Sequence, residues 1–238
     1  MRINKYLSEC GVCSRREADI FIENGDVLVN GEPAVPGAQI GDNDIVKVRG
    51  KIVNIVEKTY LAFNKPKGIV CTSEKREPNN LIDYLGYHKR ITYAGRLDKD
   101  SEGLLILTDD GDLIDALMTG SNGHEKEYVV RVARDLTDEK LKRLEKGVYL
   151  SEINRKTKPC RVTRSGELEF HIILTQGINR QIRRMCKNVG LRVVSLKRIR
   201  IANIKLSELK SGEYRELTER EIKGLRKLTE RTGRSNLR

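Results

Sequence analysis

Residues 94–111 place the strongest constraint on how this chain folds, because a polar loop there runs directly into an apolar strand. Residues 104–108 read L-L-I-L-T and end at an Asp-Asp-Gly turn, the pattern of a short buried strand. The loop before this strand carries Arg96 and Asp98 between two glycines. Catalytic carboxylates are often found on such loops, but a polar turn beside a core strand has the same composition. The rest of the chain has to distinguish these two interpretations of Asp98.

The positive charge of the chain is concentrated in one segment. The net charge is +12, from 46 Lys and Arg against 34 Asp and Glu. Residues 155–210 hold 15 Lys and Arg and 3 Asp and Glu, whereas residues 1–60 hold 8 and 9. Such clustering is expected where a protein binds the phosphate backbone of a nucleic acid. With no Trp and 3 Phe, we do not expect a single-strand binder that depends on stacked aromatic side chains.

Size and cysteine usage favour a globular protein of the cytoplasm. The chain has 238 residues and no apolar run long enough to span a bilayer. Its N-terminal segment lacks the apolar centre of a signal peptide. The 5 cysteines are an odd number and are scattered along the chain, which fits reduced thiols better than a disulfide framework. We therefore expect a cytoplasmic protein.

The first 50 residues have the pattern of a small α/β domain. Apolar spacing predicts a helix at residues 2–9, and Ser14 and Glu17 form a capping box that opens a second helix ending near Gly25. Strands are expected at residues 27–29, before an Asn-Gly turn, and at 45–48. The predicted organisation is a small domain at residues 1–50, a linker at 51–59 and a larger domain at 60–238.

The N-terminal segment resembles an S4-type RNA-binding domain. The pattern R-I-N-K-Y-L-S-E-C-G-V-C-S-R-R-E-A-D, followed by V-L-V-N-G, covers most of that module. The resemblance implies that a group of basic and hydroxyl side chains faces RNA phosphates: Arg2, Lys5, Ser14, Arg15 and Arg16. Arg15 and Arg16 would lie in the first turn of a helix, where cations oppose the helix dipole. A bound anion would compensate for that placement.

The larger part of the chain alternates between predicted strands and helices. Strands are predicted at residues 60–63, 69–72, 104–108, 124–132, 159–164, 168–174 and 192–201. Helices are predicted at residues 79–87, 112–118, 137–147 and 175–187, and from Thr218 onward. The sequence N-K-P-K-G at residues 64–68 has turn composition and separates the first two strands.

The helix predicted at residues 175–187 is unusually basic. An apolar stripe occupies one side of it, and the other sides carry Arg180, Arg183, Arg184 and Lys187. The sequence has no Asp or Glu between Glu169 and Glu208 to pair with these cations. Like charges three and four residues apart destabilise a helix unless an anion lies opposite. We therefore expect this helix to face RNA.

Motifs for metal and nucleotide binding are incomplete in this sequence. His124 and Glu125 begin like the zinc-protease motif H-E-x-x-H, but Tyr128 occupies the place of the second histidine. Cys10 and Cys13 have no second ligand pair nearby, and no Gly-Lys-Ser/Thr completes a P-loop. We therefore expect neither a metal nor a small-molecule cofactor.

Four motifs in a fixed order resemble the RsuA family of ribosomal RNA pseudouridine synthases. They are N-K-P-K-G at 64–68, G-R-L-D at 95–98, K-E-Y at 126–128 and N-R-Q-I-R-R-M at 179–185. Together with the S4-like segment the match covers nearly the whole chain. The resemblance implies an α/β (α+β) fold, in which a small S4-like RNA-binding domain precedes a pseudouridine synthase catalytic domain with a mostly antiparallel central sheet. Within the family, these segments look closest to a large-subunit enzyme that acts on 23S rRNA.

The same resemblance assigns roles to individual residues. Asp98 would be the essential carboxylate and would ion-pair with Arg183, and Tyr128 would stack on the target uracil and assist proton removal at C5. Arg96 would fill or hold the gap that the extruded nucleotide leaves in the RNA. Further RNA-binding residues are implied within the same motifs: Lys65, Asn179, Arg180, Gln181 and Arg184.

Pseudouridine formation needs a carboxylate near the anomeric carbon but no redox partner and no phosphate transfer. Asp98 would either attack C1′, as glycosidase carboxylates do, or remove the 2′ proton to give a glycal. The target base is inaccessible in a stacked helix and has to be flipped out. A glycosidase would have no need of the clustered positive charge. Two alternatives stay open: a non-catalytic ribosome-assembly or RNA-binding protein, and the same chemistry on tRNA. We expect a monomer.

Overall fold

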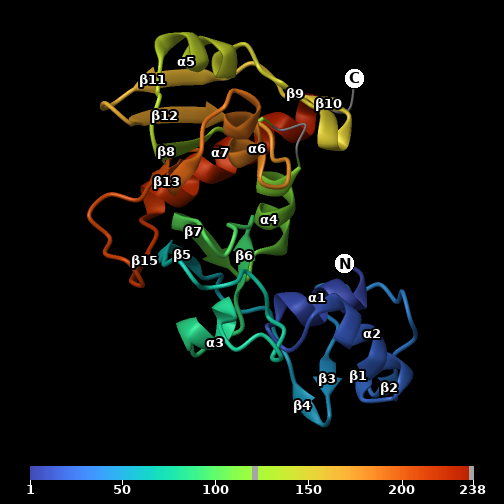
Figure 1. The fold of residues 1–238 in the computed structure, drawn as a ribbon. Helices are drawn as coiled ribbons and strands as arrows, with labels where there is room; N and C mark the ends of the chain where they lie inside the picture. Colours follow the sequence, from blue (N-terminus) through green and yellow to red (C-terminus); the bar gives the residue numbers. More distant parts are fainter. Residues whose placement is uncertain (120–122, 236–238) are drawn as a thin grey trace. The chain divides into compact units, whose positions relative to one another are not determined.

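The computed structural model describes residues 1–119 and 123–235, which form two compact units (Figure 1). The first unit comprises Met1–Thr59 together with the short segments Tyr87–Thr92 and Thr108–Gly111. The second comprises Tyr60–Gly86, Tyr93–Leu107 and the chain from Asp112 onward. Each unit has a hydrophobic core of its own. No helix in the described part of the chain is long and apolar enough to cross a bilayer.

The first unit consists of two helices and a small antiparallel sheet. Its elements are α1 (Ile3–Glu9), α2 (Arg15–Glu23), β1 (Val27–Val29), β2 (Glu32–Pro33), β3 (Val46–Val48) and β4 (Lys51–Ile52), with strand order β2-β1-β3-β4. Leu7 and Ile22 of the helices share a buried cluster with Val27 and Val46 of the sheet. The predicted helices and hairpin of this segment are confirmed.

The start of the second helix agrees with the sequence prediction, whereas the end of the predicted small domain does not. The capping box is present: the Ser14 hydroxyl accepts a hydrogen bond from the Glu17 N–H at 3.1 Å, and the Ser14 N–H donates to the Glu17 carboxylate at 2.7 Å. At the C-terminal end of the domain, β4 pairs with β3 and occupies the start of the segment 51–59 that was predicted to be a linker. Two residues are too few to show a strand pattern in the sequence.

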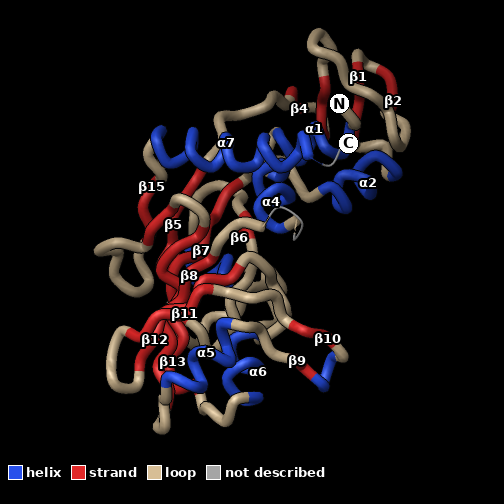
Figure 2. The backbone as a smooth tube through the Cα atoms, turned by 90° about the horizontal axis from the view of Figure 1, so that it is seen from above, coloured by secondary structure: helices blue, strands red, loops and turns tan. Residues whose placement is uncertain are grey.

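The second unit is organised around one mixed sheet (Figures 1 and 2). Its strands are β5 (Tyr60–Lys65), β6 (Thr92–Ala94), β7 (Glu102–Thr108), β8 (Lys126–Val132), β11 (Arg161–Arg164), β12 (Glu169–Leu174), β13 (Val193–Ile201), β14 (Ile204–Lys205) and β15 (Tyr214–Glu216). The order within the described residues is β11-β12-β8-β13-β7-β5-β15, with β14 beside β13 and β6 beside β7. β13 pairs with β7 in parallel, whereas its pairs with β8 and β14, and the pairs β11–β12, β12–β8 and β15–β5, are antiparallel. The predicted fold, mixed α/β with a mostly antiparallel sheet, is confirmed.

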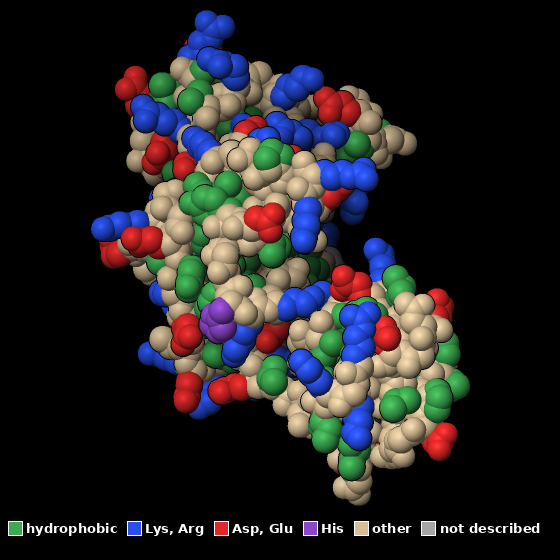
Figure 3. Space-filling model, turned by 90° about the horizontal axis from the view of Figure 1, so that it is seen from below, with side chains coloured by type: hydrophobic (Ala, Val, Ile, Leu, Met, Phe, Trp, Pro, Cys, Tyr) green, Lys and Arg blue, Asp and Glu red, His purple; other side chains and the backbone are tan. Residues whose placement is uncertain are grey.

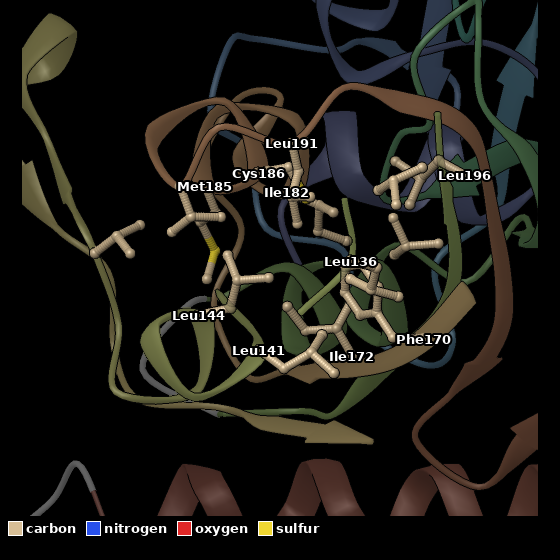
Figure 4. Packing of buried hydrophobic residues seen from close by; sticks show 14 of the residues in the cluster. Leu136, Leu141, Leu144, Phe170, Ile172, Ile182, Met185, Cys186, Leu191 and Leu196 are labelled. Atoms are coloured by element: carbon tan, nitrogen blue, oxygen red, sulfur yellow. The ribbon is translucent and has the colours of Figure 1, made fainter. Parts of the chain in front are cut away.

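Helices cover this sheet and complete two hydrophobic cores. The helices are α3 (Leu81–Leu85), α4 (Gly111–Met118), α5 (Asp138–Glu145), α6 (Gln181–Asn188) and α7 (Glu219–Ser235). Figure 4 shows the first core, where Leu141 and Leu144 of α5, Phe170 of β12 and Met185 of α6 point toward one another. In the second core, α4 and α7 pack against β5 and β7, and Leu225 is fully buried there.

Several short elements differ from the sequence predictions. Residues 69–72 do not form a strand; Val70 makes one isolated bridge with Asn80. The basic helix α6 begins at Gln181, because residues 175–180 form a loop on which Arg180 has a φ of 52°. A small hairpin of β9 (Tyr149–Leu150) and β10 (Arg155–Lys156), joined by the 3₁₀ turn η2 (Ser151–Ile153), was not predicted. Neither were β6, β14 and β15, which have two or three residues each.

The close approach of β7 and β13 at Gly103 predicts a large effect of a single methyl group. A Cβ at Gly103 would lie 2.3 Å from the carbonyl oxygen of Arg198 and 2.6 Å from its nitrogen, at a φ of 108°. Gly68 is a matched control, because its φ is also positive (91°) but no atom lies within 4 Å of its Cβ position. We expect Gly103→Ala to lower the free energy of unfolding by about 2 kcal/mol more than Gly68→Ala does, as measured by urea unfolding. Equal losses would contradict the close approach.

Candidate active site

A cavity of about 750 Å³ lies in the second unit, and the four motif segments contribute to it or to its support. Its lining comes from the loop 95–101, from β8, from the loop between β12 and α6, from β13 and from residues next to the β9–β10 hairpin. Asp98, Tyr128 and Arg180 are all among the lining residues, although they lie far apart in the sequence. Folding therefore brings three predicted site residues to one cavity.

One face of β8 contributes to both the hydrophobic core and the cavity. Val130 is fully buried in the core of α5, α6 and β12. Tyr128 and Lys126 lie on the same face of the strand, since side chains two residues apart share a face, and both line the cavity. Tyr128 pairs with Ile172 of β12 on one side and with Arg198 of β13 on the other. The tyrosine therefore sits where the core ends and the cavity begins.

The loop that carries Asp98 is held by the N-K-P-K-G segment. The N–H of Gly68 donates to the carbonyl of Lys99 at 2.8 Å, and the N–H of Leu97 points at the Cys71 sulfur at 3.4 Å. Within the loop, the Ser101 N–H donates to the Asp98 carbonyl at 3.1 Å. The Asp98 side chain is 29% exposed, so it is supported from behind and still open to a ligand.

Lys65 corrects the sequence prediction of an RNA contact. Its side chain is fully buried, and its ammonium donates to the carbonyls of Pro66 at 2.8 Å and Ile69 at 2.7 Å. Burial lowers the pKa of Lys65, and nearby acidic groups, including the Cys71 thiol and Asp100, partly compensate. Lys65 thus shapes the N-K-P-K-G loop from inside and does not offer its charge to RNA.

The ion pair of Asp98 also differs from the one expected. Arg180 lies 3.5 Å from the Asp98 carboxylate and 3.2 Å from that of Asp100. Arg183 contacts Asp100 instead, at 3.2 Å from its carboxylate and 3.0 Å from its carbonyl oxygen. The expected Asp98–Arg183 pair is therefore wrong for this structure. Asp100 links both arginines to the loop of Asp98.

The cations of α6 have acidic partners that the local sequence does not show. Glu152, in η2, pairs with Arg184 at 3.1 Å and with Lys187 at 3.2 Å. Asp100 supplies the partner for Arg180 and Arg183. The argument that these cations lack acidic partners is therefore corrected, because the partners come from segments distant in sequence. Of these four cations, Arg180 lines the cavity, and 44% of its side chain is exposed.

Gln181 and Asn179, two further predicted RNA-binding residues of this motif, differ in their exposure to solvent. Gln181 is buried: its side-chain carbonyl accepts from the Ile178 N–H at 3.1 Å, and its amide lies 3.7 Å from the Met185 sulfur. It therefore starts helix α6, and it also lines the cavity, so its contact with RNA stays a prediction. Asn179 is exposed and lines the cavity, as does Arg96.

Charges around the cavity shift several pKa values. Burial raises the pKa of Asp100, but the hydrogen bond from Arg180 and the charges of Arg183 and Arg180 outweigh it and hold this pKa below its ordinary value. These ion pairs are therefore intact above the ordinary carboxyl pKa and are lost as the pH falls through the lowered one. Burial, followed by the charge of Lys126, lowers the pKa of His124, so this imidazole is neutral in the cavity wall.

The S4-like segment presents most of its predicted RNA contacts on the surface of the first unit. Arg2, Arg15 and Arg16 are exposed, and Lys5 is half-buried. Ser14 is occupied by the capping box, so its hydroxyl has a structural role whether or not RNA is bound. Figure 3 shows one face of the molecule, on which Lys and Arg side chains are interspersed with acidic ones.

Sequence reasoning missed several residues that the structure places at the cavity. Lys126, Arg155, Lys158 and Arg198 line it, and Asp100 pairs with the lining residue Arg180. Arg155 begins β10 of a hairpin too short to predict and Lys158 follows that strand, but their basic character was a usable signal. In the described part of the chain, no group of three or more His, Cys, Asp or Glu side chains is arranged to hold a metal ion.

Comparison with known proteins assigns the class to which this fold and cavity correspond. The family model described as RNA pseudouridylate synthase matches residues 59–188, and the S4 domain model matches residues 1–46. The chain belongs to the RNA pseudouridylate synthase family. It is an RNA pseudouridine synthase, an isomerase that converts uridine in RNA to pseudouridine.

Individual relatives agree with this family. The chain is 47% identical over 232 residues to the dual-specificity RNA pseudouridine synthase RluF of Salmonella typhi, covering 96% of this chain and 80% of that protein. It is 36% identical over 233 residues to the ribosomal large subunit pseudouridine synthase B of Pseudomonas aeruginosa, covering 93% and 60%. A crystal structure of a pseudouridylate synthase matches with a TM-score of 0.69 at 29% identity, covering 94% of this chain and 99% of the other. The likeness to RluF that the sequence motifs indicated is confirmed.

The bridge through Asp100 predicts that this carboxylate supports turnover. Asp100→Asn removes the anion that holds Arg180 and Arg183 against the loop of Asp98, and misplacing a catalytic group can reduce a rate by about 10²-fold. We expect a loss of that order in pseudouridine formation. Glu152→Gln is the matched control, because it removes the carboxylate partner of the other two helix cations, Arg184 and Lys187. Equal losses in the two variants would show that Asp100 has no special role.

Proposed function

We propose that the cavity of the second unit isomerises uridine, with Asp98 as the essential carboxylate and Tyr128 against the base. The observation that carries this proposal is that Asp98 and Tyr128, from motifs 30 residues apart, line one cavity together with Arg180. Asp98 is partly exposed and ion-paired with Arg180 at 3.5 Å, a geometry that orients a carboxylate and leaves it accessible. Tyr128 has its ring at the end of the hydrophobic core, where a flipped base can stack on it.

The chemistry follows from these positions. The N1–C1′ bond of uridine breaks with its electron pair on N1, and Asp98 either bonds to C1′ or removes the 2′ proton. The base then turns within the cavity. C5 bonds to C1′ as the Asp98–C1′ bond breaks or as the proton returns to C2′, and the proton leaves C5 while N1 gains one. Arg183 serves this sequence indirectly, since it holds Asp100 and the backbone of the loop. No atoms are gained or lost.

Positive side chains around the cavity support the binding of RNA. Arg96, Lys99, Arg155, Lys158 and Arg180 all line it. Flipping a base out of its stack costs a few kcal/mol, and phosphate contacts from such cations offset that cost. Arg96 is exposed on the loop of Asp98 and is placed to occupy the space that the flipped nucleotide leaves. Asn179 and Arg184 complete the proposed set of contacts in the second unit.

The proposed substrate is a uridine of 23S rRNA. The Pseudomonas aeruginosa relative is named a ribosomal large subunit pseudouridine synthase. The relative of Salmonella typhi is named a dual-specificity enzyme, which favours keeping tRNA as the alternative. Arg2, Lys5, Arg15 and Arg16 would bind phosphates of the same RNA. We further propose that the protein works as a cytoplasmic monomer, with functional domains at residues 1–50 and 60–238.

Replacing the proposed catalytic carboxylate tests its role directly. We expect Asp98→Asn to abolish pseudouridine formation while RNA affinity stays within a few-fold, because the substitution is nearly isosteric and removes only the charge. The measurement is release of tritium from RNA that contains 5-³H-uridine. Asp138→Asn is the control, since Asp138 is an exposed aspartate outside the cavity that pairs with Arg164. Turnover by Asp98→Asn would rule out the assignment.

The substrate is tested by mapping pseudouridines in cells that lack the gene. Carbodiimide treatment followed by primer extension reads modified positions in 23S rRNA and tRNA in one experiment. We expect one or more stops in 23S rRNA to disappear and to return with the unmutated gene but not with Asp98→Asn. Loss of stops in tRNA alone would favour the alternative substrate. If no stop is lost and no tritium is released, the chain is a non-catalytic RNA-binding protein.

A further inference from the structure

Arg198 is a buried arginine whose guanidinium is only partly bonded. Its exposure is 2%, and it is the largest of the fully buried side chains. Nε donates to the Leu104 carbonyl at 2.7 Å, and Nη1 donates to the Arg96 carbonyl at 3.3 Å. Nη2 is buried without a hydrogen-bond partner, and the residue lines the cavity. Two of its nitrogens are therefore anchored to the loop and strand next to Asp98, and one is left for a ligand.

A second cation lies beside it. Lys126 is on the same face of the sheet, one pleat along β8 from Tyr128, and it also lines the cavity. Lys126 lies two residues along β8 from Tyr128, the residue that pairs with Arg198, and burial followed by the charge of Arg198 lowers the pKa of Lys126. Within the described residues, no carboxylate lies at ion-pairing distance from Lys126 or Arg198. Asp98, which lines the cavity, pairs with Arg180, and Asp100 on the same loop pairs with Arg183.

A buried cation and a half-buried one that line the same cavity without a counterion are unfavourable unless negative charge enters the cavity. Buried charges are normally paired, and a buried donor without an acceptor loses the hydration it had in the unfolded chain. The anchoring carbonyls of Leu104 and Arg96 fix the Arg198 guanidinium in place before any ligand arrives. Donors fixed in advance are most effective where charge develops during a reaction, because they need no reorganisation.

The isomerisation creates such a charge. When the N1–C1′ bond breaks, the electron pair stays with the base, and uracil becomes an anion whose charge spreads over N1, O2 and O4. Both routes open to Asp98 release the base in this form. The Arg198 guanidinium carbon lies 6.0 Å from the ring centroid of Tyr128, the residue proposed to stack on the base. The guanidinium therefore lies over the tyrosine ring on which the released uracil would stack.

We propose that Arg198, backed by Lys126, forms an anion-stabilising wall that holds the detached uracil ring between cleavage and re-formation of the glycosidic bond. The inference rests on the proposed function, because it assumes that this cavity is where uridine reacts. Arg198 has a second, positioning effect through its bonds to the backbone of the catalytic loop. The two effects differ in one respect: only charge stabilisation depends on how good a leaving group the base is.

A change of leaving group separates these effects. Fluorine at C5 stabilises the uracil anion, so 5-fluorouridine in the RNA needs less help from the protein. The experiment measures single-turnover loss of the N-glycoside, by nucleoside digestion and mass spectrometry, from matched RNAs with uridine or 5-fluorouridine at the target position. For Arg198→Met we expect a loss of about 10²-fold or more on uridine and a loss at least about tenfold smaller on 5-fluorouridine.

Companion variants make the outcome decisive. Arg198→Lys keeps a cation but loses the forked anchoring, so its two losses should be equal to within a few-fold. Lys126→Met should show the same leaving-group dependence as Arg198→Met and provides the test if the latter fails to fold. Arg200→Gln is the matched control: this arginine is on the same strand but pairs with Glu125 and Glu127, both at 2.9 Å, and does not line the cavity. Its ratio of the two rates should equal that of the unmutated chain.

Each result supports or overturns the inference. Equal losses of Arg198→Met and Lys126→Met on both substrates would show a positioning role only and would overturn it. Undiminished turnover in both variants would overturn it as well. If the unmutated chain does not consume uridine in RNA that it binds, the proposed function fails first and the inference fails with it. If Asp98→Asn is inactive but the Arg198→Met ratio is unchanged, the proposed function stands and the inference alone is wrong.

Discussion

The parallel contact between β7 and β13 is the constraint on which the site depends. It joins a strand that follows the loop of Asp98 to a strand that comes almost a hundred residues later, and it is possible because Gly103 leaves room for the backbone of Arg198. The Arg198 side chain then reaches back to the carbonyls of Leu104 and Arg96. Backbone and side chain of one residue therefore fix the position of the catalytic loop relative to Tyr128 on β8.

Opposite charges are distributed so that the cavity has a mouth and an inner wall of different character. At the mouth, Arg180 pairs with both Asp98 and Asp100, and Arg183 pairs with Asp100, which orients the carboxylate of Asp98. At the inner wall, Lys126 and Arg198 meet no carboxylate in the described part of the chain. The uncharged base of a uridine can enter between these two groups of residues. When the N1–C1′ bond breaks, the negative charge on the base lies toward the wall and the positive charge on the sugar lies toward Asp98.

Local patterns predicted local structure well. The capping box of Ser14 and Glu17, the helices α4 and α5 and the long strands β7, β8, β12 and β13 follow from periodicity and end signals that act within a few residues. The ion partners did not follow, because they join Asp100 to Arg180 and Glu152 to Arg184 through tertiary folding. The burial of Lys65 and Gln181 was also invisible, because lysine and glutamine are residue types that are mostly exposed in folded proteins. Strands of two or three residues depend on their partners and carry no periodicity of their own.

One irregularity of β13 has an evolutionary consequence. The register against β8 shifts between Arg198 and Arg200, so Arg198 lies opposite Tyr128 while Arg200 lies opposite Glu127. The extra residue sends two arginines of one strand to opposite faces of the sheet, one into the cavity and one into an ion-pair cluster behind it. A single codon gained or lost between Val193 and Ile201 would exchange the two faces and end catalysis at one step.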